Sequence, residues 1–107
     1  MKESYIYIMT NKNKTVMYIG VTADLIRRVY EHKNHEKEGS FTDHYNCEFC
    51  VYYEKYNDIK QAIDRETQLK NWNRYKKIEL INSKNPDWIE LVNDTEIINI
   101  EDLIDRR

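Results

Sequence analysis

One glutamate stands on the apolar face of a helix predicted in the second half of the chain. Ile59, Ala62, Ile63 and Leu69 form an apolar stripe, and at about 100° per residue Glu66 projects close to its middle. A carboxylate on a buried face is costly unless it is ion-paired or bound to a metal. Glu66 is therefore a candidate metal ligand, and an ion pair with an arginine such as Arg65 is the structural alternative.

Arg28 and His32 form a second candidate group, on a helix predicted earlier in the chain. They are four residues apart and so share one helix face, whereas Arg27 points further toward solvent. A guanidinium stabilises charge on a phosphate through paired donors, and an imidazole relays protons. Taken alone, however, the pair is explained better as surface neighbours than as a site.

Three tyrosines on a predicted hairpin, Tyr5, Tyr7 and Tyr18, form the third group. Tyrosine is favoured in strands, so packing in the core is the default interpretation. A phenol that met Arg28 and Glu66 would be able to accept a proton, because a neighbouring cation or metal lowers its pKa.

Cys47 and Cys50 form a C-x-x-C pair, and His44 lies three residues before it. A zinc site needs about four ligands, and a second cysteine pair is absent, although His32 and His35 could complete a site with His44. A redox pair needs a helix that starts after its first cysteine, whereas the residues around Cys50 are typical of a strand. We therefore expect ordinary strand packing rather than metal binding or redox chemistry.

The charge is distributed unevenly along the chain. The 107 residues correspond to one domain, and their net charge of −2 argues, taken alone, against a nucleic-acid partner. Residues 1–86 hold 15 basic and 12 acidic side chains, a net charge of +3, whereas residues 87–107 hold 2 basic and 7 acidic ones, a net charge of −5. Basic side chains of the first part are candidate nucleic-acid contacts, with solvated helix faces as the alternative. They are Arg27, Lys70, Arg74, Lys76 and Lys77.

Targeting signals are missing from the sequence. No apolar run approaches the roughly 20 residues that cross a bilayer, so no membrane partner is expected. The N-terminal residues lack the apolar segment of a signal peptide, and two cysteines without such a peptide indicate a reducing compartment. These features predict a cytoplasmic protein.

The apolar pattern predicts an α/β (α+β) fold, a small antiparallel sheet with helices packed on it. The first two strands form a hairpin whose second strand ends at Gly20, and Asn85-Pro86 starts a short helix as its N-cap and first residue. Residues 1–93 are predicted to form the domain and residues 94–107 an acidic tail. The predicted strands cover 5–9, 16–19 and 49–53, the predicted helices cover 24–36, 58–73, 74–83 and 87–91, and a loop covers 40–46.

The order and spacing of several sequence segments resemble those of the GIY-YIG nucleases over about residues 3–92. The second half-motif is intact as Tyr18-Ile19-Gly20, and the helix after it carries Arg28. The segments 62–72 and 85–88 resemble those of small stand-alone members. The first half-motif departs from the pattern, because Tyr5 replaces the glycine of Tyr5-Ile6-Tyr7.

The resemblance implies a three-stranded antiparallel sheet flanked by helices, and hydrolysis of a DNA phosphodiester with one divalent ion, Mg²⁺ or Mn²⁺. It implies that Glu66 binds the metal and that Arg28 stabilises the pentavalent phosphate. Tyr18 is then the predicted general base, and Tyr7 and His32 orient the attacking water or relay its proton.

Two alternatives stay open on the sequence alone. The same fold could serve as a catalytically silent nucleic-acid-binding module, because the domain is small and its tail is acidic. Residues 94–107 could cover the basic face or mediate self-association, since apolar and acidic residues alternate in them.

Asn85 matches a supporting position in the family's site, with the role of a helix N-cap as the alternative.

Overall fold

A computed structural model describes residues 3–105 and contains one three-stranded antiparallel sheet. The strands are β1 (Ser4–Thr10), β2 (Met17–Thr22) and β3 (Phe49–Tyr56), arranged in the order β2-β1-β3. The predicted α+β fold class and the hairpin are thus confirmed. The end of the second strand was predicted wrongly, because β2 continues through Gly20, which pairs with Tyr7 of β1.

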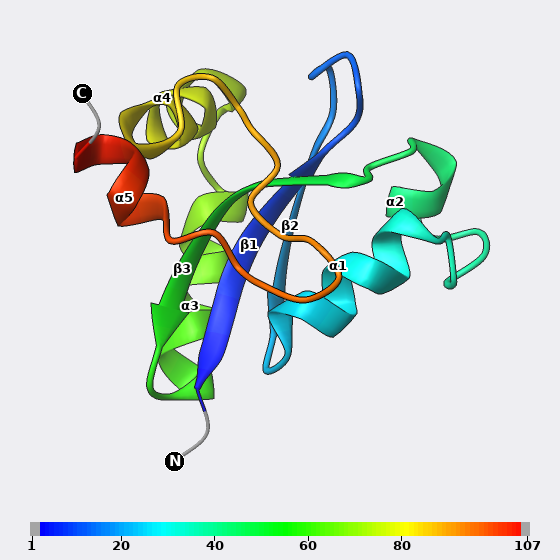
Figure 1. Cartoon of the computed structure of the whole chain (residues 1–107), viewed down its shortest axis with the longest axis horizontal. Coiled ribbons are helices and arrows are strands. Elements are labelled where there is room, and N and C mark those ends of the chain that lie inside the picture. Colours follow the sequence, from blue (N-terminus) through cyan, green and yellow to red (C-terminus); the bar gives the residue numbers. More distant parts are fainter. Residues whose placement is uncertain (1–2, 106–107) are drawn as a thin grey trace.

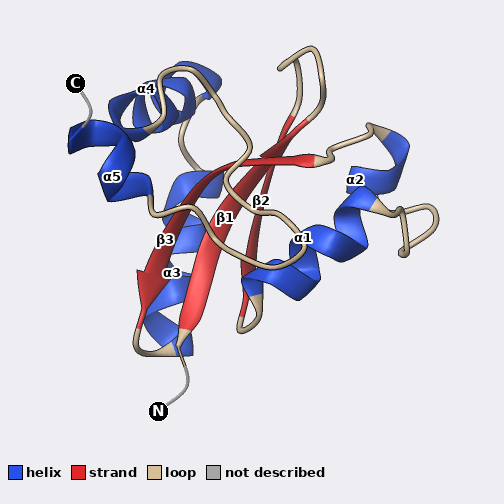
Figure 2. Ribbon diagram, viewed as in Figure 1, coloured by secondary structure: helices blue, strands red, loops and turns tan. Residues whose placement is uncertain are grey.

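Helices lie on both faces of this sheet (Figure 1, Figure 2). Helix α3 (Ile59–Lys70) lies behind it, on the face of Ile6 and Ile8, and is attached to β3 by the ion pair between Arg65 and Glu54 at 2.9 Å. Helix α1 (Leu25–Lys33) and the chain after α4 (Arg74–Lys84) lie in front, on the face of Tyr7. The alternation along β1 therefore separates two layers of side chains.

Side-chain caps explain where the helices begin. Asp24 accepts a hydrogen bond from the backbone of α1, and Asp58 accepts one from the backbone of α3. Ser40 caps α2 (Phe41–His44) in the same way. The prediction of a loop over 40–46 was therefore wrong in part, because the Ser40 cap starts a short helix there.

Asn85 has a different structural role from the one predicted. It ends α4 as a C-cap, and its buried amide donates to the carbonyls of Val51 and Ile89 and accepts from the Ile89 amide. No helix forms over 87–91, so that prediction was wrong. Trp88 has φ 52°, in the left-handed region, which no right-handed helix admits.

The C-terminal segment packs against the front of the sheet. The Tyr53 hydroxyl donates to the carbonyl of Ile98 and accepts from the amide of Ile100, which begins α5 (Ile100–Asp105). Glu101 pairs with Lys84 of α4 at 3.0 Å. The division into a domain 1–93 and a tail 94–107 stays a prediction. No helix within 3–105 is long and apolar enough to cross a membrane.

Candidate active site

The Tyr7 phenol crosses β2 through the space that Gly20 leaves open. A Cβ atom built on Gly20 would lie 2.5 Å from the Tyr7 hydroxyl oxygen and 2.6 Å from its Cζ. Any larger residue would therefore collide with the buried ring. The glycine that follows Tyr18-Ile19 is thus a packing requirement, which lets a phenol of the central strand reach α1.

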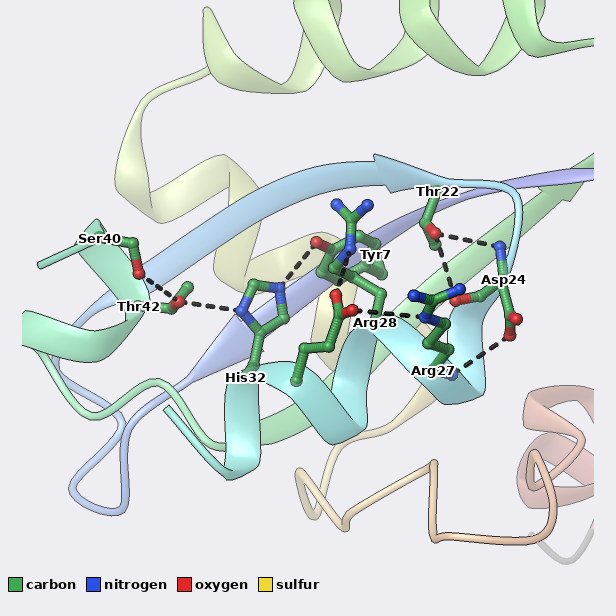
Figure 3. Close-up of polar contacts among 9 residues, drawn as sticks. Tyr7, Thr22, Asp24, Arg27, Arg28, His32, Ser40 and Thr42 are labelled. Atoms are coloured by element: carbon green, nitrogen blue, oxygen red, sulfur yellow. Dashed lines mark hydrogen bonds and ion pairs between the residues drawn. The ribbon is translucent and has the colours of Figure 1, made fainter. Parts of the chain in front are cut away.

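The Tyr7 hydroxyl meets His32 at the end of this path (Figure 3). It lies 2.8 Å from His32 Nε2, and His32 Nδ1 lies 2.9 Å from Thr42 Oγ1 of α2. Ser40 Oγ extends the chain at 3.3 Å from the Thr42 hydroxyl. The expectation of a surface histidine was wrong, because the His32 side chain packs inward and the residue is only 7% exposed.

Burial and charge keep this phenol–imidazole pair neutral. Burial, reinforced by the Arg28 guanidinium, lowers the pKa of His32 to about 4. Burial and the nearby Tyr18 phenol raise the pKa of Tyr7 above its ordinary value, and the positive charge of Arg28 opposes that shift. A neutral imidazole has one N–H and one lone pair, so one ring nitrogen of His32 can accept a proton.

Arg28 places a positive charge next to the pair. Figure 3 shows its guanidinium beside the Tyr7 hydroxyl. Its Nε lies 3.2 Å from Glu31, and about a third of its side chain is exposed. Arg27 pairs with the same glutamate at 3.4 Å, but its side chain is 76% exposed and points outward, as predicted. Arg28 is therefore the arginine that can meet a ligand at the phenol–imidazole pair.

Tyr18 borders the same pair from the edge strand β2. Its ring centroid lies 5.5 Å from that of His32 and 6.3 Å from that of Tyr7. The structure thus brings together Tyr7, Tyr18, Arg28 and His32, which come from two strands and one helix.

Glu66 lies on α3, on the other side of the sheet. Of the predicted apolar stripe, Ala62 and Leu69 are buried whereas Ile59 and Ile63 are exposed, so that prediction was wrong in part. The reason is that α3 covers the sheet with a narrower face than the stripe. The Glu66 side chain is 21% exposed and so remains accessible to solvent.

The ion-pair partner of Glu66 is Lys70, at 3.5 Å. The predicted alternative partner, Arg65, bonds Glu54 instead. Within residues 3–105, no hydrogen bond or ion pair joins Glu66 directly to the phenol–imidazole pair. Lys70 nevertheless lines a cavity of about 260 Å³ together with Tyr18, which relates the Glu66–Lys70 ion pair to one residue of the site.

The five basic candidates do not form one patch. Lys70 and Lys77 line the cavity beside Tyr18. Lys76 lies over the Trp72 ring, 4.2 Å from its centroid, and Arg74 donates to the carbonyl of Lys14. Only Lys70 and Lys77 of these candidates therefore line the cavity beside Tyr18.

Comparison with known protein families identifies a catalytic domain over most of the chain. The model of the GIY-YIG catalytic domain matches residues 3–79. The chain belongs to the GIY-YIG family. Domains of this family are generally endonucleases, which hydrolyse phosphodiester bonds.

Relatives of this GIY-YIG chain are small proteins of similar length. A UPF0213 protein of Syntrophus aciditrophicus is 29% identical over 87 residues, which cover 81% of this chain and 98% of the relative. A UPF0213 protein of Staphylococcus saprophyticus is 31% identical and covers 76% and 96%. The solution NMR structure of a UPF0213 protein from Bacillus halodurans has 25% identity and a TM-score of 0.49, and covers 78% and 86%.

GIY-YIG nucleases generally use a divalent metal ion, and Glu66 fits that requirement. It is a partly exposed carboxylate that pairs with Lys70, a lysine whose side chain is half exposed. Hard cations such as Mg²⁺ take oxygen ligands, often one or two carboxylates with several waters. A group of three or more His, Cys, Asp or Glu suited to a metal is not found in the described chain. A site on Glu66 would thus rest on one protein ligand.

Of the C-x-x-C pair of this GIY-YIG domain, Cys50 lies in β3 as the strand pattern predicted, whereas Cys47 lies before that strand. Cys47 and Cys50 are buried free thiols. Burial raises the pKa of Cys47 to about 11 and that of Cys50 to about 12, so both stay protonated at neutral pH. Protonated buried thiols are poor nucleophiles and poor metal ligands.

Sequence reasoning missed Ser40 and Thr42, which hold His32 from α2. The signal was present, because Ser40 and Asp43 are three residues apart, a spacing typical of the start of a helix. A helix there would have placed Thr42 two residues after its cap, in the first turn.

The neutral His32 predicts a loss of stability in acid. Its folded pKa of about 4 lies below the ordinary 6.5, so the unfolded chain binds more protons between these values. The stabilisation is complete above pH 6.5 and is lost as the pH falls toward 4, by up to about 3 kcal/mol. We expect His32→Gln to reduce the difference in unfolding free energy between pH 7 and pH 4.5, measured by urea denaturation.

His44→Gln is the matched control, because His44 is exposed on α2. It should leave the pH dependence of the unfolding free energy as in the wild type. Equal pH dependence in both variants would contradict a buried neutral His32.

Proposed function

We propose that this chain is a divalent-metal-dependent DNA endonuclease of low sequence specificity. The observation that carries the proposal is the buried hydrogen bond between Tyr7 and His32, with the Arg28 guanidinium beside it. A proton acceptor and a fixed cation at one place are what hydrolysis of a phosphodiester requires. Arginine contacts to phosphate carry no sequence information, which agrees with low specificity.

Proton transfer would run through the phenol–imidazole pair. In the tautomer in which His32 Nδ1 donates to Thr42 Oγ1, Nε2 accepts from the Tyr7 hydroxyl. As the attacking water gives its proton to the Tyr7 oxygen, the phenol proton passes to Nε2. The high pKa of Tyr7 argues against a free phenolate, so the two transfers must be coupled.

Charge on the reacting phosphate would be met from two sides. Arg28 would donate to the nonbridging oxygens, because its guanidinium offers paired N–H donors at a fixed position. A divalent ion held by Glu66, Mg²⁺ or Mn²⁺, would supply neutralisation of charge on the phosphate and on the leaving 3′ oxygen. Glu66 would have to exchange its contact with Lys70 for the ion, which a surface ion pair of this kind permits.

The two tyrosines give a direct test of the proton route. The sequence points to Tyr18 as the base, whereas the Tyr7–His32 bond favours Tyr7. We expect Tyr7→Phe to lower the single-turnover rate of DNA cleavage by about 10²–10⁴-fold, the usual contribution of general base catalysis. Tyr18→Phe should cost less than about tenfold, because its ring remains in place. The reverse order of effects would assign the base to Tyr18.

The activity itself is measured on supercoiled and branched DNA with Mg²⁺, with Mn²⁺ and with EDTA. Metal-dependent nicking or cutting is the expected result. Binding to DNA without cleavage under any metal would instead support a catalytically silent module on the same fold.

A further inference from the structure

Three aromatic rings lead from the site to the outer surface of α2. The Tyr18 and Phe41 rings stack with their centroids 5.9 Å apart and their planes 30° from parallel, and the Phe41 and Tyr45 centroids are 4.7 Å apart. Phe41 is 45% exposed and Tyr45 is 43% exposed. Large apolar rings that remain exposed side by side often mark a binding surface. We call Tyr18, Phe41 and Tyr45 the aromatic row.

A cavity opens along this row. Its volume is about 260 Å³, and Met17, Tyr18, Ile19 and Phe41 form its apolar wall. Lys70 and Lys77 also line it and supply positive charge. Because β2 is an edge strand, α3 and α4 can contribute these lysines from one side while α2 contributes Phe41 from the other.

The combination matches one kind of ligand. Aromatic side chains in a basic groove are how proteins bind single-stranded nucleic acid, with bases stacked on the rings and phosphates at the cations. In a duplex both faces of a base are covered by its neighbours. A ring such as Phe41 can therefore stack only on a base that is unpaired and unstacked.

We propose that the aromatic row binds an unpaired base next to the scissile phosphate, with the neighbouring phosphates at Lys70 and Lys77. The position follows from Tyr18, which contacts both Phe41 and His32. The preferred substrate is then a single strand or an unpaired segment at a branch. The position next to a cleaved phosphate rests on the proposed nuclease function. Binding of the unpaired base itself does not require cleavage.

The test measures binding in EDTA, where no cleavage occurs. Single-stranded oligonucleotides with one 2-aminopurine are titrated with the full chain, and the same sequence is offered as a duplex. We expect quenching of the fluorescent base on binding, and a lower Kd for the single strand. Phe41→Ala should weaken single-strand binding about tenfold, a change of ~1.4 kcal/mol, and leave duplex binding within about twofold.

Two further variants separate stacking from folding. Phe41→Tyr keeps a ring and should restore the affinity and the quenching. Tyr30→Ala removes an aromatic ring of equal exposure, 47%, from the side of α1 about 200° away from Arg28, and should change neither. Thermal melts of all variants show whether Phe41→Ala has lost its fold. If it has, Phe41→Tyr becomes the deciding variant, and its failure to restore binding would count against the proposal.

Salt dependence tests the lysines. Lys70→Ala and Lys77→Ala should each lower the slope of log K against log salt concentration by about 0.7 for a single strand, the value for one phosphate contact. Lys60→Ala makes the same change of charge at the exposed start of α3 and should leave the slope unchanged.

Other outcomes overturn the inference. Equal binding of single strand and duplex, or an unchanged Kd in Phe41→Ala, would exclude the aromatic row as a base platform. A dimer that Phe41→Ala dissociates, without effect on the fluorescent base, would assign the row to a second copy of the chain. Quenching without cleavage by the wild type under any metal would retain the platform and reject the nuclease.

Discussion

Glu66→Gln is expected to lower the rate of metal-dependent DNA cleavage by about a thousandfold, which corresponds to ~4 kcal/mol. An amide keeps the size of the side chain but is a weak ligand for a hard cation, and metal stabilisation of a phosphoryl group is worth several kcal/mol. Single-turnover cleavage of a labelled oligonucleotide at saturating protein measures the loss.

Binding gives the second measurement for Glu66. The substitution releases Lys70 from its ion pair, so the affinity for DNA should stay equal or rise. The affinity for Mn²⁺, measured by electron paramagnetic resonance without DNA, should fall. Glu79→Gln, at an exposed position of α4, is the matched control and should alter neither quantity. Full activity in Glu66→Gln would remove the carboxylate from the mechanism.

Arg28→Lys is expected to lower the same rate by about 10²–10³-fold. Lysine keeps the positive charge but loses the forked donors that fit the oxygens of a phosphate. It also loses the Nε that is paired with Glu31, so the remaining charge is held less firmly.

Arg27→Lys makes the identical change one residue away. Arg27 pairs with the same glutamate but points into solvent, and we expect less than about a threefold effect. Equal effects at both positions would mean that the two arginines serve only the stability of α1.

The shared faces of the candidate site residues could be predicted from the sequence because their spacing reflects local structure, whereas their proposed roles came from the resemblance to the GIY-YIG nucleases. Alternation in β1 puts Tyr7 on one face, and the spacing of Arg28 and His32 puts both on one side of α1. These rules hold before any tertiary contact forms.

The burial of the candidate site residues and their hydrogen-bond partners could be established only from the three-dimensional structure. Nothing local distinguishes a surface histidine from His32, whose inward direction depends on a phenol 25 residues earlier and on Thr42 of α2. Asn85 shows the same limit. Its position before a proline favours an N-cap, but the carbonyl of Val51 in β3 decides its role. For Glu66, the width of the α3 contact with the sheet decided which stripe residues are buried.

The net charge of −2 is likewise explained by position. Lys70 and Lys77 stand at the cavity, whereas acidic Glu101 lies against Lys84 on α4. The net charge of the whole chain conceals this separation. The value of −2 therefore does not argue against a nucleic-acid substrate.

The reaction proposed for this site is hydrolysis of a phosphodiester with water as the nucleophile. Cleavage in H₂¹⁸O, followed by mass spectrometry of the DNA ends, tests it most directly. We predict metal-dependent cleavage that leaves 3′-hydroxyl and 5′-phosphate ends, with one ¹⁸O atom in the phosphate, and loss of this product in Glu66→Gln and Arg28→Lys. DNA left intact with Mg²⁺ and Mn²⁺, or a labelled product formed equally by both variants, would contradict the account.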